Sequence, residues 1–450
     1  MKLYTGFSRV DCTPLHGAPL GGYGNAPHRI GNNVLLPVTV SCTAFRDETG
    51  TTALMVSQDT CGTEKAHTRQ FKKLLCNQFG IPQENIFFSA THTHSGPTEG
   101  VYPDIPCHVE WTETRYYPAV LEACGNALRD LSECVIYAGC GTVEKMNFIR
   151  RYIGTDDRFL GNWSTGGDPN AHHETDPDTQ LQVIRFAREG KKDIYMVNWQ
   201  AHPCFHCGEN RLDISADYPH YLRTVIEQRL DADAVFVQGG AGNLITKGLL
   251  SGESYAERGF VSDTGDPDPC RWYGTALAEK VIALVPTLRK LESGAIRTAE
   301  KAVELTVDHR RDAEKDICKK IWDVYNSGAQ EEAKTLAKAS GFAGGPYECR
   351  DIYLKSKYGP TDAFPVWAMR IGSLGFAYFP YEMFDTNAMY VRSHSQCAMT
   401  FVCELTNEGH SYMPSEVAFL HGGYEVRSCK YIPGMSEKLA AECTDLLNSL

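Results

Sequence analysis

The sequence predicts an α/β fold in which mixed β-sheets are flanked by helices. Short apolar runs typical of buried strands alternate with helical segments along the chain. Near the N-terminus a helix at 65–79 links strands at 52–57 and 85–88, and this order favours a right-handed crossover in a parallel or mixed sheet. No internal repeat or low-complexity linker divides the chain, so we expect one large domain over residues 1–450.

The expected elements begin after a long irregular segment. Residues 1–36 are rich in Gly, Pro and Asn, and such segments tend to cover a site. Strands at 38–45 and 52–57 follow, joined by a turn at 47–50, and the helix at 65–79 ends at Gly80. The later elements, in order, are a helix at 116–131, strands at 134–139 and 143–146, a polar loop or lid at 154–178, strands at 181–186 and 193–199 with a turn at 189–190, a helix that opens at 215–218 and ends near 230, a strand at 235–237, a helix at 271–291, a strand at 296–309, surface helices within 310–340, strands at 366–371, 376–379 and 399–404, and a helix at 437–447.

Composition excludes several classes of protein. The net charge of −12 argues against a nucleic-acid or anionic membrane surface, and no apolar run is long enough to span a bilayer. The N-terminus lacks the apolar core of a signal peptide, so we expect a cytoplasmic protein. The 17 cysteines have no framework spacing and are expected to be reduced. The sequence is compatible with a homo-oligomer and does not define the oligomeric state.

Several polar residues have no assigned partner at this stage. Cys204 and Cys207 form a Cys-x-x-Cys pair, but a structural zinc site of this type needs a second pair, and the sequence contains none. His206 and Cys207 either line a pocket or pack. Asp59 follows a strand, and His172 with His173 is expected to be solvated in a polar loop.

The stretch 89–97, Ser-Ala-Thr-His-Thr-His-Ser-Gly-Pro, is the densest group of polar side chains. It follows the buried strand at 85–88, and open α/β sheets place ligands at the carboxyl ends of strands. Residues two apart on an extended backbone point the same way, so His92 and His94 are expected to face one site. The alternative is a pair of polar loop residues before a Gly-Pro stop.

Other strands also run into polar groups. His202 follows the strand at 193–199, Glu382 follows the strand at 376–379, and Tyr412 comes shortly after the last strand. A catalytic metal needs about three protein ligands and an open position, and histidines with one carboxylate suit zinc. A lone His-Pro or a lone Glu is more often an ordinary loop or surface residue, so the sequence alone leaves their convergence open.

The 89–97 stretch resembles the hallmark of the neutral ceramidases and their shorter bacterial relatives. Further segments resemble that family's blocks in the same order, and the resemblance covers most of the chain. These segments are Asn198-Trp199-Gln200-Ala201-His202-Pro203, Phe379-Pro380-Tyr381-Glu382-Met383-Phe384, Tyr412-Met413-Pro414-Ser415-Glu416 and Gly422-Gly423-Tyr424-Glu425.

The resemblance implies a zinc site and a set of roles. Zinc would be held by His92, His202, Glu382 and Tyr412. His94 and Tyr424 would contact the scissile carbonyl. Arg150 or Arg151 would bind or polarise the substrate; we assign Arg150 to catalysis and Arg151, with Asn243, to substrate binding.

Two departures from the family argue against membrane ceramide as the substrate of this chain. In the turn at 242–247, the serine position of the family is Ile245, so a serine nucleophile is absent there, and the adjacent Thr246 has no identified base. The chain also ends without the extra C-terminal β-sandwich of the long, secreted ceramidases. We therefore expect a cytosolic relative that acts on a soluble small molecule.

The expected function is that of a zinc-dependent amidohydrolase that cleaves the linear amide bond of a small acylated substrate. Zinc would lower the pKa of a water molecule and polarise the amide carbonyl. His94 and Tyr424 would stabilise the oxyanion or pass a proton to the leaving amine. One alternative is a zinc esterase, deacylase or lactonase acting on a polar metabolite. Another is a non-catalytic metal-bearing binding protein, whose only support is the altered turn.

Overall fold

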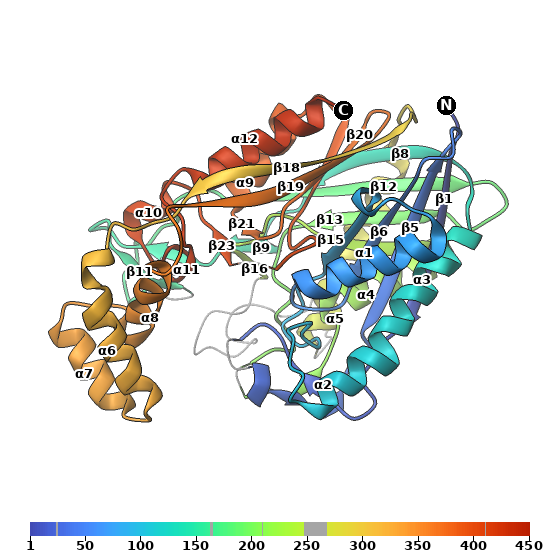
Figure 1. The fold of residues 1–450 in the computed structure, drawn as a ribbon. Helices are drawn as coiled ribbons and strands as arrows, with labels where there is room; N and C mark the ends of the chain where they lie inside the picture. Colours follow the sequence, from blue (N-terminus) through green and yellow to red (C-terminus); the bar gives the residue numbers. More distant parts are fainter. Residues whose placement is uncertain (24–25, 163–164, 209, 247–267, 410) are drawn as a thin grey trace.

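Two β-sheets lie face to face, and helices cover their outer faces (Figure 1). The computed structural model describes residues 1–450 except 24–25, 163–164, 209, 247–267 and 410. A core cluster joins the sheets, with Phe45, Met55 and Phe87 from the larger sheet packed with Met369 and Phe376 from the smaller one. The described part therefore has four layers, helix, sheet, sheet and helix.

The larger sheet has strand order β15-β13-β12-β8-β1-β5-β6-β7, with β17 paired to β8. The β6–β7 and β13–β15 pairs at its two edges are parallel. The two edges of the sheet approach each other. The Ser57 hydroxyl on β6 donates to the carbonyl of Phe236 on β15 over 2.9 Å. The strands are β1 Leu3–Asp11, β5 Thr39–Asp47, β6 Thr52–Gln58, β7 Ile86–Ala90, β8 Ser132–Thr142, β12 Gln180–Arg188, β13 Ile194–Trp199, β15 Asp233–Gln238 and β17 Arg289–Lys290.

Strand β6 shows why this sheet is buried on both faces. Side chains alternate along a strand, so Met55 points to the smaller sheet while Leu54 and Val56 point to the helices. Both faces are covered, which accounts for the continuous apolar character of the strand. The covering helices are α1 Lys65–Phe79, α3 Tyr117–Arg129, α4 Tyr218–Leu230 and α5 Pro269–Leu284.

The smaller sheet carries the C-terminal part of the chain. Its order is β18 (Ile296–Thr306), β19 (Thr361–Ile371), β20 (Leu374–Tyr378) and β22 (Met399–Cys403). Helices α9 (Asp385–His394) and α12 (Met435–Asn448) pack on its outer face.

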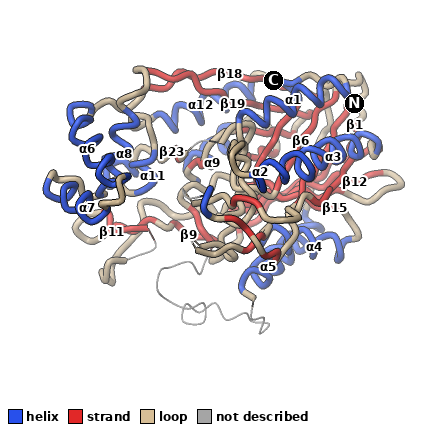
Figure 2. The backbone as a smooth tube through the Cα atoms, turned by 60° about the horizontal axis from the view of Figure 1, so that its bottom comes forward, coloured by secondary structure: helices blue, strands red, loops and turns tan. Residues whose placement is uncertain are grey.

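A separate helical lobe has its own apolar cluster and stands to one side of the sheets in both views (Figure 2). It consists of α6 (Lys315–Asn326), α7 (Gln330–Ala339) and α8 (Gly345–Lys355). The remaining short elements are β2 Ala18–Pro19, β3 Ile30–Gly31, β4 Asn33–Val34, β9 Asn147–Ile149, β10 Arg151–Ile153, β11 Phe159–Asn162, β14 Asp213–Ile214, β16 Leu244–Thr246, β21 Glu382–Met383, β23 Tyr412–Met413, α2 Pro106–Trp111, α10 Ala418–His421 and α11 Tyr424–Ser428.

The predicted fold class is confirmed, whereas two local predictions are wrong. Residues 1–36 are not irregular throughout, because Leu3–Asp11 forms a central strand between β5 and β8. Gly6 lets α3 pack against this strand, since a Cβ there would lie 2.1 Å from the Ala127 carbonyl oxygen. Residues 143–146 form a turn with Lys145 at φ 64° rather than a strand.

Several boundaries also differ from the predicted ones. The helix expected to end at 291 ends at Leu284, and the helices α2 and α8 to α11 were not predicted.

All 17 cysteines are free. Within the described ranges, no helix combines the length and apolar character needed to cross a bilayer. The single-domain organisation stays a prediction.

Candidate metal centre and active site

The loop after β7 brings His92 and His94 together, but not by the predicted route. His92 has a φ of 70°, so the backbone is not extended there, and the alternation argument was wrong. The backbone N–H of His92 donates to the Thr60 carbonyl, and that of His94 donates to the Pro203 carbonyl. These bonds fix a turn in which the Nε2 atoms of the two histidines lie 3.3 Å apart.

At this turn the His92 side chain meets the side chains of two residues from distant segments. His202 follows β13, and Glu382 begins β21. The Glu382 Oε2 atom lies 3.3 Å from the Nε2 of His92 and 3.1 Å from the Nε2 of His202. Both imidazoles are buried, with 2% and 0% of their residue surfaces exposed. These three residues form the group that we call the central cluster.

Hydrogen bonds on the far side of each ring determine which nitrogen faces the central cluster. The Nδ1 atom of His92 donates to the Cys61 carbonyl over 2.6 Å, and that of His202 donates to the Leu244 carbonyl over 2.7 Å. A carbonyl oxygen only accepts, so Nδ1 carries a proton in each ring. The Nε2 lone pairs of the neutral rings then point at the Glu382 carboxylate. An Nδ1–H bonded to a carbonyl, with Nε2 turned to the site, is the second-shell pattern of metal-binding histidines.

The pKa values of the central cluster follow from burial and charge. Burial favours the neutral ring, yet Glu382 and Cys61 raise the pKa of His92 well above its usual value. Burial and the Arg150 charge lower the pKa of His202 to about 4. A proton on His92 can therefore serve as the cation in the absence of a metal, and zinc would replace that proton. The donor set of two imidazoles and one carboxylate fits zinc.

Tyr412 lies next to the central cluster. Strands β21 and β23 pair in parallel with Glu382 opposite Tyr412. The Arg150 guanidinium carbon lies 5.2 Å from the centre of the Tyr412 ring. Burial raises the pKa of the Tyr412 hydroxyl well above its usual value, so the phenol is neutral unless a nearby cation favours its ionisation.

A cavity of about 450 Å³ lies beside His94 and Arg150, which contact the central cluster; we call it the acyl cavity after the role proposed for it below. His94, Arg150, Tyr412 and Tyr424 contribute to its wall. The pKa of His94 is well below its usual value because of burial and the neighbouring His92 and His202, so its ring is neutral. The rest of the described wall consists of Gly22, Tyr23, Asn162, Cys204, Cys207 and Ile245.

Arg150 and Arg151 have different environments although they are adjacent. Arg150 donates through Nε to Glu425 and through Nη2 to the Gly242 carbonyl, and its Nη1 lies 3.3 Å from the His202 Nε2. Arg151 donates to the carboxylates of Glu174 and Glu425 and does not line the acyl cavity.

Asn243 is also outside the described wall of the acyl cavity. Its side-chain amide donates to Asp385 over 2.8 Å and accepts from the Asp385 backbone N–H over 3.0 Å. Of the turn at 242–247, Lys247 lies outside the described residues.

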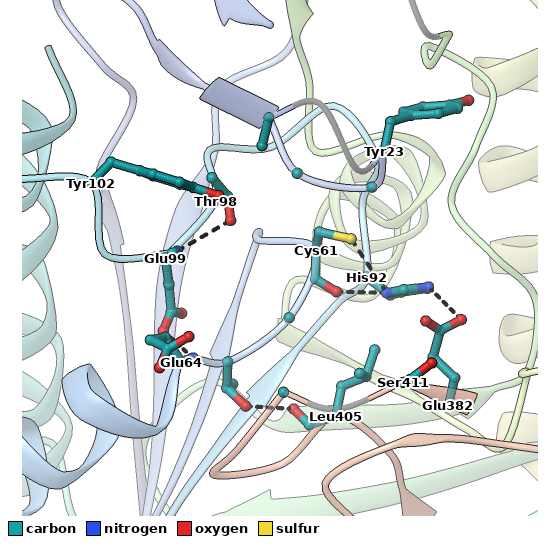
Figure 3. Close-up of a pocket in the computed structure, with 17 residues that line it drawn as sticks. Tyr23, Cys61, Glu64, His92, Thr98, Glu99, Tyr102, Glu382, Leu405 and Ser411 are labelled. Carbon is teal, nitrogen blue, oxygen red and sulfur yellow. Dashed lines mark hydrogen bonds and ion pairs between the residues drawn. The ribbon is translucent and has the colours of Figure 1, made fainter. Parts of the chain in front are cut away.

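A second cavity of about 400 Å³, the acidic cavity, lies on the other side of the central cluster. Figure 3 shows Glu64 and Glu99 across this cavity from His92 and Glu382. Its described wall contains no Lys or Arg. Glu99 is 3% exposed, and burial raises its pKa to about 8.

Sequence reasoning missed several residues that shape the site. A Cβ on Gly22, whose φ is 94°, would lie 2.5 Å from the His94 Cγ, so this glycine lets the chain pass directly over the ring. In the sequence, the Gly21-Gly22 pair was the signal that could have indicated this close approach of the backbone. Glu99 gave no signal, and Glu425 stands in the 422–425 segment that resembles a family block but was assigned no role. The partner of Asp59 is Arg223, which binds it through two hydrogen bonds of 2.9 Å.

Comparison with known proteins places the fold. No family model matches the sequence. The neutral ceramidase from Pseudomonas aeruginosa is similar to the whole chain at a TM-score of 0.72 and 18% identity, over 74% of that protein's length. A ceramidase solved in complex with C2 is similar at a TM-score of 0.71 and 16% identity, over 100% of this chain and 75% of that one. The chain thus has the fold of the neutral ceramidases, as its motifs predict.

Proposed function

We propose that the protein is a zinc-dependent hydrolase that cleaves the linear amide bond of a small N-acyl compound. The central cluster carries this proposal, because two buried imidazoles face the Glu382 carboxylate on the wall of the acidic cavity. His94 and Arg150, which line the acyl cavity, contact the same imidazoles. The ceramidase fold supports the reaction class, since the similar proteins are named for hydrolysis of an N-acyl bond.

The chain would supply binding, charge stabilisation and proton transfer. His92, His202 and Glu382 would hold zinc, with Tyr412 as a further ligand. When bound, zinc would lower the pKa of a water molecule and polarise the substrate carbonyl. Arg150 is fixed by Glu425 and by the Gly242 carbonyl, so its charge is preorganised to stabilise an oxyanion.

His94 and Tyr424 are our candidates for moving protons. The neutral His94 ring has its Nε2 3.3 Å from the central cluster and can accept a proton and return it to the leaving amine. Tyr424 is 46% exposed at the mouth of the acyl cavity, where its hydroxyl could donate to the substrate carbonyl. We retain a substrate-binding role for Arg151 and Asn243 only as an indirect one, through Glu425 and Asp385.

The two cavities suggest where each half of the substrate binds. Ile245 and Cys204 make part of the acyl cavity apolar, which suits a short acyl chain. The acidic cavity, whose described wall offers the Glu99 carboxyl, Thr98 and Ser411 and no Lys or Arg, suits an amine part rich in hydroxyl groups. This assignment favours a soluble metabolite over membrane ceramide. The cytoplasmic location and a homo-oligomeric state remain predictions.

A substrate screen tests the proposed function. Metal-free and zinc-reconstituted protein would be assayed with matched N-acyl amines and acyl esters that share acyl chains of two to eight carbons. We expect hydrolysis of N-acyl amines by the zinc form alone, with preference for amines that carry hydroxyl groups. Preferential ester cleavage would favour an esterase or deacylase, and absence of hydrolysis across the library would support the non-catalytic alternative.

A further inference from the structure

A second group of buried metal-binding side chains lies beyond the central cluster. His206, Asp217 and Cys270 place one nitrogen, one oxygen and one sulfur within 4.8 Å of one another. Cys270 and Asp217 are both 0% exposed, and His206 is 9% exposed. The three residues come from the loop after β13 and from the starts of α4 and α5. None of them lines the acyl or the acidic cavity.

A fourth donor stands at the edge of this group. The Oδ1 atom of Asp268 lies 3.6 Å from the Nε2 of His206. The Nδ1 atom of His206 lies 2.8 Å from the Ser215 hydroxyl oxygen, which already accepts the backbone N–H of Asp217. A proton on Nδ1 can therefore be donated to Ser215, which leaves the Nε2 lone pair facing the two carboxylates. Metal-binding histidines use this same arrangement.

The Asp217 carboxylate lies beside the His206 ring and the Cys270 thiol. Asp217 forms no ion pair with a Lys or Arg among the described residues, and its carboxylate is held by the backbone N–H groups of Phe205, His206 and Tyr218. Those bonds leave acceptor capacity on Oδ1, next to the Cys270 sulfur. A buried carboxylate and a thiol side by side favour a bound cation, because a divalent ion stabilises both the carboxylate and a thiolate.

We propose that His206, Asp217 and Cys270, with Asp268 as the fourth ligand, bind a structural zinc ion separate from the central cluster. Cysteine, histidine and carboxylate are zinc ligands, and four protein ligands without access to a cavity are the pattern of a structural site. On binding, the Cys270 S–H bond breaks, its proton leaves to solvent, and a zinc–sulfur bond forms.

The second site would stabilise the floor of the acyl cavity. His206 follows the metal ligand candidate His202 by four residues, and Cys204 and Cys207 from the same loop line the acyl cavity. A metal held between this loop and the starts of α4 and α5 would fix the loop against both helices. This proposal does not depend on the proposed function, because it concerns metal content and stability.

A further cysteine-containing group, next to the central cluster, is not suited to bind a metal ion through its cysteine. Cys61, His92 and His94 also place donors within 4.8 Å, but the Nδ1 of His92 that faces the Cys61 sulfur donates to the Cys61 carbonyl. That nitrogen therefore has no free lone pair for a metal shared with Cys61.

Metal counting on single variants tests the second site. Elemental analysis of the zinc-loaded full chain should give two zinc ions in the wild type, one in His92→Ala and one in Cys270→Ser. Cys124→Ser is the matched control, because Cys124 is also a fully buried helix residue and the variant should keep two ions. A Cys270→Ser variant that holds as much zinc as the wild type, or a wild type whose zinc is lost completely in His92→Ala, would overturn the proposal.

Cobalt substitution gives a second readout that does not require Cys270→Ser to fold. A thiolate bound to Co²⁺ produces a charge-transfer band in the near ultraviolet. We expect this band in the wild type, in His92→Ala and in Cys61→Ser, since neither change touches the second site. Loss of the band in His92→Ala or Cys61→Ser, or its absence from the cobalt-loaded wild type, would contradict the proposal.

Discussion

The two groups of metal-binding side chains differ in access more than in chemistry. The central cluster has two imidazoles and a carboxylate, and His92 and Glu382 line the acidic cavity. The second group has an imidazole, a thiol and carboxylates, and it lines neither cavity. Catalytic zinc sites keep an open position and structural sites do not. The comparison teaches that the surroundings of a donor set, rather than the donors alone, decide its role.

The largest expected effect follows from removing a ligand of the open site. His92→Ala should lower kcat/KM by about 10³-fold or more, because metal polarisation contributes several kcal/mol and 1.36 kcal/mol corresponds to a factor of ten. The measurement is steady-state kinetics on the best N-acyl substrate, with Glu332→Gln on the exposed surface of α7 as the control. A variant that keeps its activity would refute the catalytic role of this site.

The next effect distinguishes the two adjacent arginines. Arg150→Met should lower kcat by about 10²-fold, as expected for loss of an oxyanion-stabilising group. Arg151→Met should act mainly on stability, by about 3–5 kcal/mol, because Glu174 and Glu425 would lose a buried partner. Kinetics together with urea unfolding of both variants measure these effects. Equal losses of kcat in the two folded variants would contradict the assignment of Arg150 alone to the cavity.

A smaller effect is expected from displacing His94. Gly22→Ala places a methyl group 2.5 Å from the His94 Cγ and should lower kcat/KM by about 10- to 100-fold through misplacement of the ring. Gly50→Ala is the matched control, because Gly50 has nearly the same φ, 93°, and no atom within 4 Å of the added carbon. Backbone strain alone would make the two variants equivalent in activity, and that outcome would count against a role of Gly22 in positioning His94.

The smallest effect on activity is expected at the closed site. Cys270→Ser should change kcat/KM less than tenfold. His92→Ala, which keeps the second site, should gain about 2.7 kcal/mol of unfolding free energy at free zinc 100 times the Kd of this site, and the variant with both substitutions should not. Thermal or urea unfolding at graded zinc concentrations, in a His92→Ala background, isolates the second ion. An equal gain in the variant with both substitutions would mean that the stabilising zinc binds elsewhere.

The sequence could predict the parts of the site that carry local signals. His92, His202 and Glu382 each follow an apolar strand. The strand pattern alone did not say that the three side chains meet, whereas the family resemblance implied it. In the structure they are in contact. The helix at Lys65–Phe79 was predicted to the residue, because Gly80 in the left-handed conformation ends it.

Features that depend on contacts between distant segments could not be predicted in this way. Arg150 lies between β9 and β10 and Arg151 begins β10, so two adjacent residues have different surroundings. The acidic cavity brings together Glu99 and Glu382, which are far apart in the sequence. The strand Leu3–Asp11 was missed because its alternation is interrupted by Gly6, a residue required by the close approach of α3.

The most direct test of the central claim is anomalous diffraction at the zinc edge from crystals of the zinc-loaded protein. We expect a peak that is about 2 Å from the Nε2 atoms of His92 and His202 and from a carboxylate oxygen of Glu382. A peak elsewhere, with none among these three residues, would contradict the account.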